Sequence, residues 1–279
     1  MPELPEVRAH AERLTTSHAG AVLTGFRPIA FHALKTVVPR PDEAVGRALV
    51  AVTTRGKLLV LGFGDVAFVV HLMQGGRLNP DTKLSAKPRG GLARWTFDGA
   101  DALLLTEAGT EKKAGVWVVA GDPDSSAPLA GLGPDADRLD RAGLDALLDD
   151  AGGSRLHGVL RDQARLAGLG RRLANEICWS ARLSPFAPAG RLSDEQRSAL
   201  LGAIGSCVAA SLTDERERDV MVRSAERLAA VHHRAGEACP RCGDTVRQVS
   251  YRAYEVDYCP TCQTDGKVLA DNTTSKFLK

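Results

Sequence analysis

The first residues of the chain carry a nitrogen that could act as a nucleophile. If Met1 is removed, Pro2 presents a free α-amine, whose ordinary pKa of about 8 lies below the value of about 10.4 for lysine. A useful fraction of such an amine is unprotonated at neutral pH and can attack a carbon. Because the nitrogen is secondary, condensation with an aldehyde-level carbon would give a charged iminium directly. Glu3 follows as a candidate acid or base, although the segment PELPE alone would also fit a disordered tip with a helix-starting proline.

Four cysteines near the other end of the sequence have the spacing of a metal site. Two CxxC pairs, Cys239–Cys242 and Cys259–Cys262, are separated by sixteen residues. Each pair brings two thiolates to one metal, and two pairs complete a tetrahedral site with no open position for chemistry. We therefore expect one structural zinc ion, held by a hairpin of strands at 246–250 and 254–258. A redox dithiol pair is the alternative, but it would need a βαβ context that the sequence lacks.

Length and composition are those of an ordinary soluble protein with two or three domains. The 279 residues are 44% apolar and 25% charged. No apolar run is long enough for a bilayer span, and Glu3 and Glu6 argue against a signal peptide, so we expect a cytoplasmic protein. The net charge of +2 neither demands nor excludes nucleic acid. An arginine-rich stretch at 155–182 could be a binding surface or only a solvated helix face.

The periodicity of apolar residues divides the chain into a strand-rich part and a helical part. After a helix over residues 1–14, short strands are expected at 57–63, 66–72, 93–97, 102–106 and 115–120. Several short strands in about 120 residues favour a β-sandwich or barrel. A segment rich in proline, glycine and serine at 121–134 is the expected linker. Helices are then expected at 139–148, 156–163, 171–182 and 200–210, with a capping box at Ser193, and a fifth at 215–231.

These features together resemble the Fpg/Nei family of DNA glycosylases, over essentially the whole chain. The shared elements, in order, are the PELPE start, an RGK segment at 55–57, a Gly-Leu-Gly turn at 168–170 and the four-cysteine finger. The resemblance implies an α+β multidomain fold. A catalytic β-sandwich with an N-terminal helix would occupy 1–121, followed by a linker at 122–136. A helix–two-turn–helix domain would occupy 137–235, and the zinc finger and tail 236–279.

The resemblance also implies roles for individual residues in base-excision repair. Pro2 would be the Schiff-base nucleophile at the sugar C1′, Glu3 the acid or base that opens the sugar ring, and Lys57 a phosphate contact that assists elimination. Glu6 and Glu176 would support the site. The partner would be damaged double-stranded DNA, from which the damaged base must be flipped out before it can be attacked.

The residues that would read the DNA depart from the family pattern. The finger arginine is replaced by Tyr254, and Arg252, on the same face of an extended strand, could substitute for it. Of the residues that would fill the void, Met73 is followed by Gln74 in the first loop. The second loop, at 110–114, has Lys112 in place of an arginine and Ala114 in place of an aromatic residue. His157 replaces a lysine, and Arg171 replaces an asparagine. The expected DNA contacts are Met73, Gln74, Lys112, His157 and Arg171.

Three functions remain open at this stage. The first is a bifunctional glycosylase and AP lyase whose lesion range is shifted away from 8-oxoguanine opposite cytosine. The second is a DNA-binding protein that senses lesions or abasic sites with weakened excision, which the changes at Ala114, Arg171 and Tyr254 would favour. The third, a zinc-ribbon module for RNA or transcription, explains only residues 236–279. We expect a monomer that associates with the nucleoid through DNA.

Overall fold

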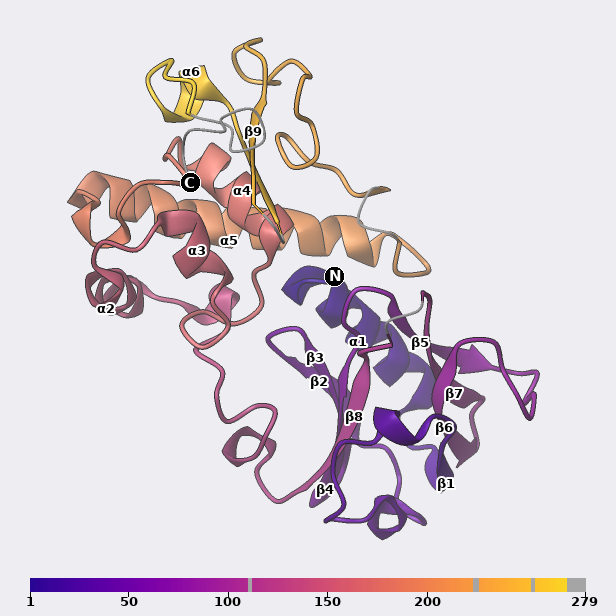
Figure 1. The fold of residues 1–279 in the computed structure, drawn as a ribbon. Coiled ribbons are helices and arrows are strands. Elements are labelled where there is room, and N and C mark those ends of the chain that lie inside the picture. Colours follow the sequence, from indigo (N-terminus) through magenta and orange to yellow (C-terminus); the bar gives the residue numbers. More distant parts are fainter. Residues whose placement is uncertain (110–111, 223–225, 252–253, 270–279) are drawn as a thin grey trace. The chain divides into compact units, whose positions relative to one another are not determined.

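The structure is a computed structural model in which residues 1–109, 112–222, 226–251 and 254–269 are described (Figure 1). The chain forms two compact units. Unit 1 comprises Met1–Gly131 together with the short segment Arg218–Met221. Unit 2 comprises Leu132–Glu217 and the chain from Val222 onward. The four-part division at 121, 136 and 235 that the sequence predicts stays a prediction.

Unit 1 contains two antiparallel four-stranded sheets, with strand orders β1-β6-β7-β5 and β2-β3-β4-β8. All five strands expected from the sequence are present, and β1, β2 and β5 are additional. The strands are β1 (Val22–Pro28), β2 (Ala51–Arg55), β3 (Leu58–Phe63), β4 (Val66–His71), β5 (Gly76–Asp81), β6 (Gly91–Asp98), β7 (Ala102–Glu107) and β8 (Gly115–Ala120). Short 3-10 turns lie at η1 (Phe31–Ala33), η2 (Pro41–Ala44) and η3 (Pro123–Ser125).

Aromatic rings and aliphatic side chains from both sheets form the core of unit 1. Trp95 on β6 and Phe68 on β4 are fully buried, and their ring centroids lie 5.7 Å apart in an edge-to-face arrangement. Helix α1 (Leu4–His18) buries Leu4, Val7 and neighbouring apolar residues and packs on β2. The start of the chain is therefore anchored to the sandwich by its own apolar face rather than left as a loose tip.

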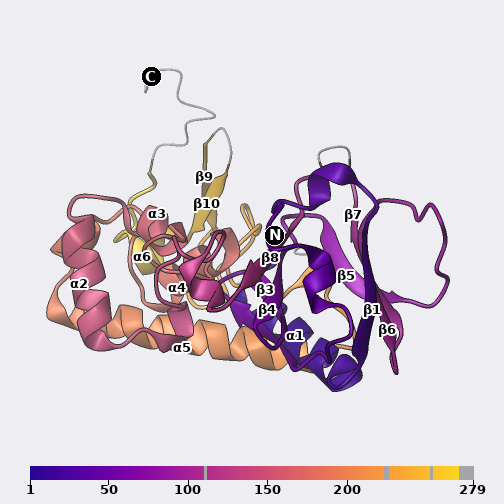
Figure 2. The same cartoon turned by 90° about the horizontal axis from the view of Figure 1, so that it is seen from below.

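Unit 2 is mainly helical. Helix α5 (Asp194–Arg216) runs along the unit, and α2 (Arg141–Ala151) and α4 (Arg171–Ser180) both pack on it (Figure 2). The short helix α3 (Leu156–Arg161) contacts α4, and η4 (Ala136–Arg138) and η5 (Ala189–Arg191) complete the set. Ser193 caps α5 through the predicted capping box, its hydroxyl accepting a hydrogen bond from the Gln196 backbone. No helix in the described part of the chain combines the length and the apolarity needed to cross a membrane.

The finger of unit 2 contains the expected hairpin. Strands β9 (Arg247–Ser250) and β10 (Glu255–Tyr258) pair antiparallel, with Val249 opposite Val256. A single helical turn, α6 (Pro260–Gln263), follows and carries the last cysteine. The α+β fold class expected from the sequence is confirmed: two sheets with a helix, a helical region, and a hairpin with four cysteines.

The predicted fifth helix over 215–231 is wrong. Helix α5 continues to Arg216, and the described residues from 218 to 231 contain no α-helix. The segment Arg218–Met221 belongs to unit 1, where Met221 joins the apolar core and Arg13 donates to the Arg218 carbonyl oxygen at 3.2 Å. Arg227 is buried against Glu215, with Nε and Oε1 3.1 Å apart. These tertiary contacts outweigh the helical periodicity of the segment.

Candidate functional site

The start of α1 fixes the residues around Pro2. Pro2 is buried, and Glu3, only 4% exposed, occupies the N-cap of the helix. Glu3 and Glu6 form a reciprocal capping box, in which the Glu3 backbone N–H donates to Glu6 Oε2 at 2.5 Å. A negative charge is favoured at this end of a helix, which stabilises both carboxylates. Glu6 therefore acts on the backbone that carries Glu3, and the position next to Pro2 is rigid.

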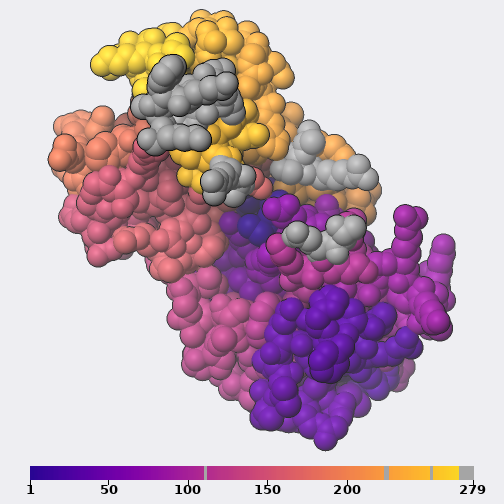
Figure 3. All heavy atoms as spheres, in the orientation of Figure 1, coloured from indigo at the N-terminus to yellow at the C-terminus, as the bar shows by residue number. Residues whose placement is uncertain are grey.

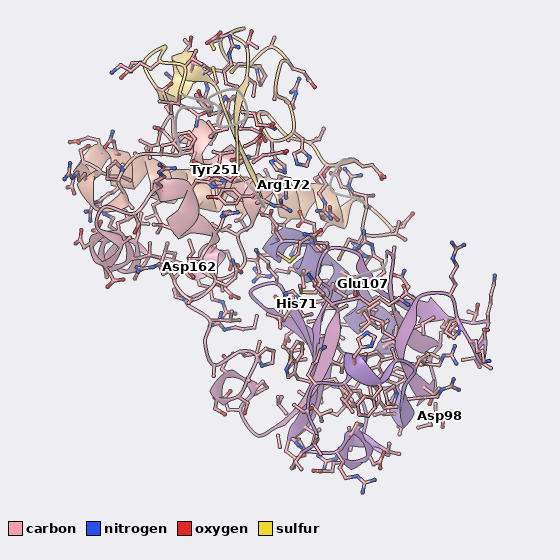
Figure 4. The ribbon with its side chains drawn as sticks, in the orientation of Figure 1. His71, Asp98, Glu107, Asp162, Arg172 and Tyr251 are labelled. Atoms are coloured by element: carbon pink, nitrogen blue, oxygen red, sulfur yellow. The ribbon has the colours of Figure 1, made fainter. Side chains whose placement is uncertain are left out.

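Lys57 follows a tight turn between β2 and β3. Gly56 has a φ of +56°, a conformation that suits glycine, and it reverses the chain between Arg55 and Lys57. The Lys57 side chain is 5% exposed. His71 lies at the end of β4 (Figure 4), and its pKa is lowered to about 4, first by burial and second by the charge of nearby Lys57. His71 is therefore neutral at physiological pH.

The first predicted loop holds Met73 in an unusual conformation. Met73 has a φ of +52°, and its backbone N–H donates to His71 Nδ1 at 3.2 Å. The Gly76 N–H closes the turn on the Leu72 carbonyl at 2.8 Å, and a Cβ at Gly76 would lie 2.1 Å from that oxygen. Only glycine fits there. The turn presents Met73, which is partly exposed, and Gln74, which is exposed. Non-glycine residues with positive φ are frequent at functional sites.

The second predicted loop adjoins the first at its base. The Ala108 N–H donates to the Gly75 carbonyl at 3.4 Å, and the buried Glu107 accepts from the Ala114 N–H at 2.7 Å (Figure 4). Ala114 is fully buried in the core, so its side chain cannot project from the surface to fill a void in DNA. Residues 110 and 111 lie outside the described part of the chain.

Lys112 lies at a pocket of about 610 Å³ in unit 1. Arg89, Glu107 and Lys112 are among the charged residues that line it. The neighbouring loop at 82–89 protrudes from unit 1 (Figure 3) and carries exposed lysines. Sequence reasoning missed Arg89 and His71. His71 could have been found as the one polar residue at the end of an apolar strand. Nothing in the sequence connected Arg89 with Lys112.

In unit 2, the Gly-Leu-Gly turn leads directly into α4. Gln163 holds this turn, because its amide donates to the Leu169 carbonyl at 2.8 Å and its Oε1 accepts from Gly168 N–H at 3.0 Å. Arg171 is the first residue of α4 and is partly exposed. Arg172 is buried, with Nη1 3.2 Å from the Ser211 hydroxyl. The arginine-rich stretch is therefore not a uniform solvated face.

Glu176 holds the segment that precedes the finger. Its carboxylate accepts three backbone hydrogen bonds, from Ala230 at 2.7 Å, Val231 at 3.0 Å and His232 at 2.9 Å. Asp257, which is fully buried, accepts from the next residue, His233, at 2.8 Å. The arrangement gives Glu176 a positioning role.

Tyr254 and His157 lie together at the finger hairpin. Their rings are nearly parallel, with centroids 6.0 Å apart, and the Arg161 guanidinium lies 3.9 Å from the Tyr254 ring centroid. The candidate substitute Arg252 lies outside the described residues. His157 is buried, and this burial, with the charge of Arg161 next in importance, lowers its pKa to about 3. It therefore carries no charge at neutral pH, in contrast to the lysine that the sequence resemblance predicts at this position.

The four finger cysteines have the geometry of a tetrahedral metal site. Their Sγ atoms all lie within 4.8 Å of one another, with Cys239–Cys262 at 3.9 Å and Cys242–Cys259 at 3.4 Å. Zinc–sulfur bonds of about 2.3 Å in a tetrahedron require sulfur–sulfur separations of about 3.8 Å, so the residues fit a zinc ion. Burial raises the pKa of Cys239, but hydrogen bonds, chiefly from Trp179 Nε1 at 3.4 Å, outweigh it and bring the pKa to about 6. Burial raises the pKa of the Cys259 and Cys262 thiols, so a bound cation would be needed to hold all four sulfurs as thiolates.

Comparison with known proteins agrees with this arrangement. Residues 1–109 match the profile of the formamidopyrimidine-DNA glycosylase N-terminal domain, and residues 236–264 match the zinc finger found in FPG and IleRS. The formamidopyrimidine-DNA glycosylase of Chloroflexus aurantiacus is 30% identical, over 94% of this chain and 98% of its own length. Endonuclease 8 of Pectobacterium atrosepticum is also 30% identical, over 95% of this chain and its full length. The chain belongs to the Fpg/Nei family of DNA glycosylases.

Solved structures of Fpg/Nei proteins have the same fold. The crystal structure of MutM (Fpg) from Thermus thermophilus superposes with a TM-score of 0.81 at 26% identity, covering 94% of this chain and 98% of that one. Lactococcus lactis Fpg, bound non-covalently to DNA with an AP site, superposes with a TM-score of 0.81 at 20% identity. That alignment covers 94% of this chain and 99% of the Lactococcus chain. The family and fold expected from the motifs are thus confirmed.

Proposed function

We propose that this protein is a base-excision-repair glycosylase with AP lyase activity on damaged double-stranded DNA, and that Pro2 is its nucleophile. The observation that carries the proposal is the start of α1. A proline there precedes an N-cap glutamate whose backbone is tied to Glu6, so the amine and the Glu3 carboxylate have a fixed relationship once Met1 is removed. A held geometry of this kind reduces the entropic cost of attack.

The proposed reaction proceeds through one covalent intermediate. The lone pair of the Pro2 nitrogen forms a bond to C1′, the bond from C1′ to the base breaks, and the base leaves with a proton. Glu3 donates a proton to the ring oxygen as the sugar opens and the iminium forms. The Glu3 carboxylate, having given up its proton, accepts one from C2′, and this expels the 3′ phosphate. Water then releases Pro2 from the cleaved strand. Lys57, beside a neutral His71, contacts phosphate and stabilises the departing charge.

We further propose that the lesion range is shifted away from 8-oxoguanine opposite cytosine. Ala114 is buried rather than projecting, and Lys112 has no planar fork for bidentate contact with a base. Met73, Gln74 and Arg171 remain proposed DNA contacts, whereas His157, also expected to contact DNA, is buried and presents no atom to it. Zinc would be held by the four cysteines and would stabilise the finger without joining the reaction. We propose that residues 1–121 form the catalytic domain, 137–235 the helical DNA-binding domain and 236–279 the finger and tail, in a monomer.

Borohydride trapping on abasic duplex DNA tests the nucleophile. The mature wild-type protein should form a covalent complex, and Pro2→Gly, which replaces the secondary amine by an unconstrained primary amine, should form less of it. Pro5→Ala is the matched control, because Pro5 lies in the same turn but has no free amine, and it should still be trapped. An absence of trapping by wild-type protein of confirmed mature N-terminus, or a trapped adduct that peptide mass analysis places on a residue other than Pro2, would refute the proposal. A panel of defined lesions tests the range: preferred excision of 8-oxoguanine opposite cytosine would contradict the proposed shift.

Lesion-dependent binding without trapping would instead favour the second candidate, a DNA-binding protein with weakened excision. The observation behind it is Tyr254, whose ring is covered by the Arg161 guanidinium at 3.9 Å and provides no charge of its own for phosphate. The same gel that detects trapped complex separates these two functions.

A further inference from the structure

Four side chains of unit 2 form a layered group at the finger hairpin, which we call the aromatic stack: Arg161, Tyr254, Tyr251 and His157. The Tyr251 and Tyr254 rings are 18° from parallel, with centroids 4.7 Å apart. The Arg161 guanidinium lies over the Tyr254 ring at 3.9 Å. The hairpin itself fixes the two tyrosines, because the Tyr251 N–H donates to the Tyr254 carbonyl at 2.8 Å.

The aromatic stack contains two residues, His157 and Tyr254, that differ from the family pattern and lie far apart in the sequence. His157 on α3 and Tyr254 on the hairpin are 97 residues apart in the chain, yet their rings are nearly parallel at 6.0 Å. Both replace basic residues expected from the family resemblance. Neither ring is open to a ligand, because His157 is buried and Tyr254 has the Arg161 guanidinium and the Tyr251 ring against it. The two residues therefore support Tyr251 from behind.

His157 also has an unused polar atom. Its Nε2 is buried and has no hydrogen-bond partner among the described residues. A buried polar atom of this kind is costly unless a partner is supplied. Because this atom is shut off from solvent, it supports the packing behind Tyr254 and offers no contact to an approaching ligand.

Tyr251 is the last ring of the aromatic stack, and a hydrogen bond from Arg155 holds its hydroxyl. Arg155, which is exposed, donates from Nη1 to the Tyr251 hydroxyl at 2.6 Å. Tyr251, labelled in Figure 4, is partly exposed. In the described part of the chain, Tyr254 is the one aromatic ring that lies against it. A ring that is stacked on one side and held at its hydroxyl loses little freedom on binding another flat group.

We propose that Tyr251 and the aromatic stack behind it bind an unpaired nucleobase of the DNA. The base stacks on Tyr251 as the next layer after Tyr254, and Arg155 lies at the rim, where it can contact the adjoining phosphate. This inference rests on the proposed function for its DNA substrate but not for its chemistry. It predicts that part of the affinity for DNA with an unpaired base is insensitive to salt, because stacking releases no counterions.

The test uses 2-aminopurine, whose fluorescence is quenched by stacking, placed either as a bulged base or as a paired base in otherwise identical duplexes. Wild-type protein should quench the bulged probe on binding and leave the paired probe little changed. Tyr251→Leu should abolish this quenching and weaken binding of the bulged duplex about tenfold. Tyr251→Phe, which keeps the ring and loses the hydroxyl, should retain the quenching.

The measurement on wild-type protein can refute the proposal by itself, even if a variant folds poorly. Bulged probe that stays fluorescent while bound to wild-type protein overturns the stacking site, as does quenching that survives Tyr251→Leu in protein with full metal content. Trapping on abasic DNA is scored separately. Trapping without quenching refutes this inference alone, and quenching without trapping refutes the proposed lyase alone.

Discussion

Met73 donates its backbone N–H to Nδ1 of His71 across 3.2 Å, and this bond requires that Nδ1 carry no proton. The pKa of His71, lowered to about 4 by burial and then by Lys57, keeps the ring in that state. In the unfolded chain the ordinary value of 6.5 applies. Between pH 6.5 and 4 the unfolded state therefore binds a proton that the folded state does not.

The free energy of unfolding should consequently fall as the pH drops from about 6.5 to about 4. His71 should contribute at most about 3 kcal/mol to this fall. In His71→Gln, urea unfolding at about pH 7 and about pH 4.5 should show a smaller difference than in wild type. The matched comparison is His10→Gln in the same unit, because the pKa of His10 is also lowered to about 4, chiefly by burial, and its loss should reduce the pH dependence likewise. Equal pH dependence in wild type and both variants would contradict the assignment.

Replacing Glu176 should loosen the segment before the finger. In Glu176→Gln, one carbonyl oxygen must replace a charged carboxylate that accepts three backbone N–H groups, so we expect a loss of about 2 kcal/mol in unfolding free energy. Amide hydrogen exchange at Ala230, Val231 and His232 should become faster. Glu195→Gln, at an exposed site on α5, is the control and should leave this exchange unchanged. Unaltered protection in Glu176→Gln would refute the positioning role.

Metal removal should affect the finger and spare the sandwich. Cys242→Ser or Cys259→Ser should lower the bound zinc, measured by atomic emission, and reduce affinity for DNA. Near-ultraviolet circular dichroism from Trp95, which is buried in unit 1, should persist. Cys207 is not part of the four-cysteine cluster, so Cys207→Ser is the control and should retain the metal. One equivalent of zinc in the Cys242→Ser and Cys259→Ser proteins would show that the ligands are assigned wrongly.

The proposed phosphate contacts should make DNA affinity depend steeply on salt. A plot of log affinity against log salt concentration should have a negative slope, and Lys112→Gln should reduce its magnitude by about 1. Arg191→Gln, at an exposed position on η5 where we propose no contact, is the control. A flat plot for wild type would argue against binding through phosphates, and an unchanged slope for Lys112→Gln would remove Lys112 from the interface.

Local patterns predicted what depends on local chemistry. The CxxC pairs specified the cysteine cluster, alternation and β-branched residues located five strands, and Ser193 marked the start of α5. Strand β2 was missed because Val52 is its one buried residue, which leaves too weak an apolar pattern. The helix expected at 215–231 failed for the opposite reason. Its periodicity is real, but Met221 and Arg227 are buried by tertiary contacts that no sequence window contains.

The candidate site divides in the same way. Pro2, Glu3 and Lys57 were identified from short motifs, and the capping box that restrains Glu3 follows from the spacing of Glu3 and Glu6. The pairing of His157 with Tyr254 could not be foreseen, because it depends on how α3 and the hairpin come together in space. Sequence reasoning treated the two as separate losses, whereas the structure shows them as one aromatic group.

The return of Arg218–Met221 to unit 1 has a consequence for dissecting the protein. Because Met221 is part of the first unit's core, a fragment that stops at Gly131 would lack one of its own buried side chains. The complementary fragment, which begins after Gly131, would have to expose Met221 to water. Unit 1 is therefore built from two separate stretches of the chain. If the chain is cut near residue 131, the two halves should have to be coexpressed to become well ordered.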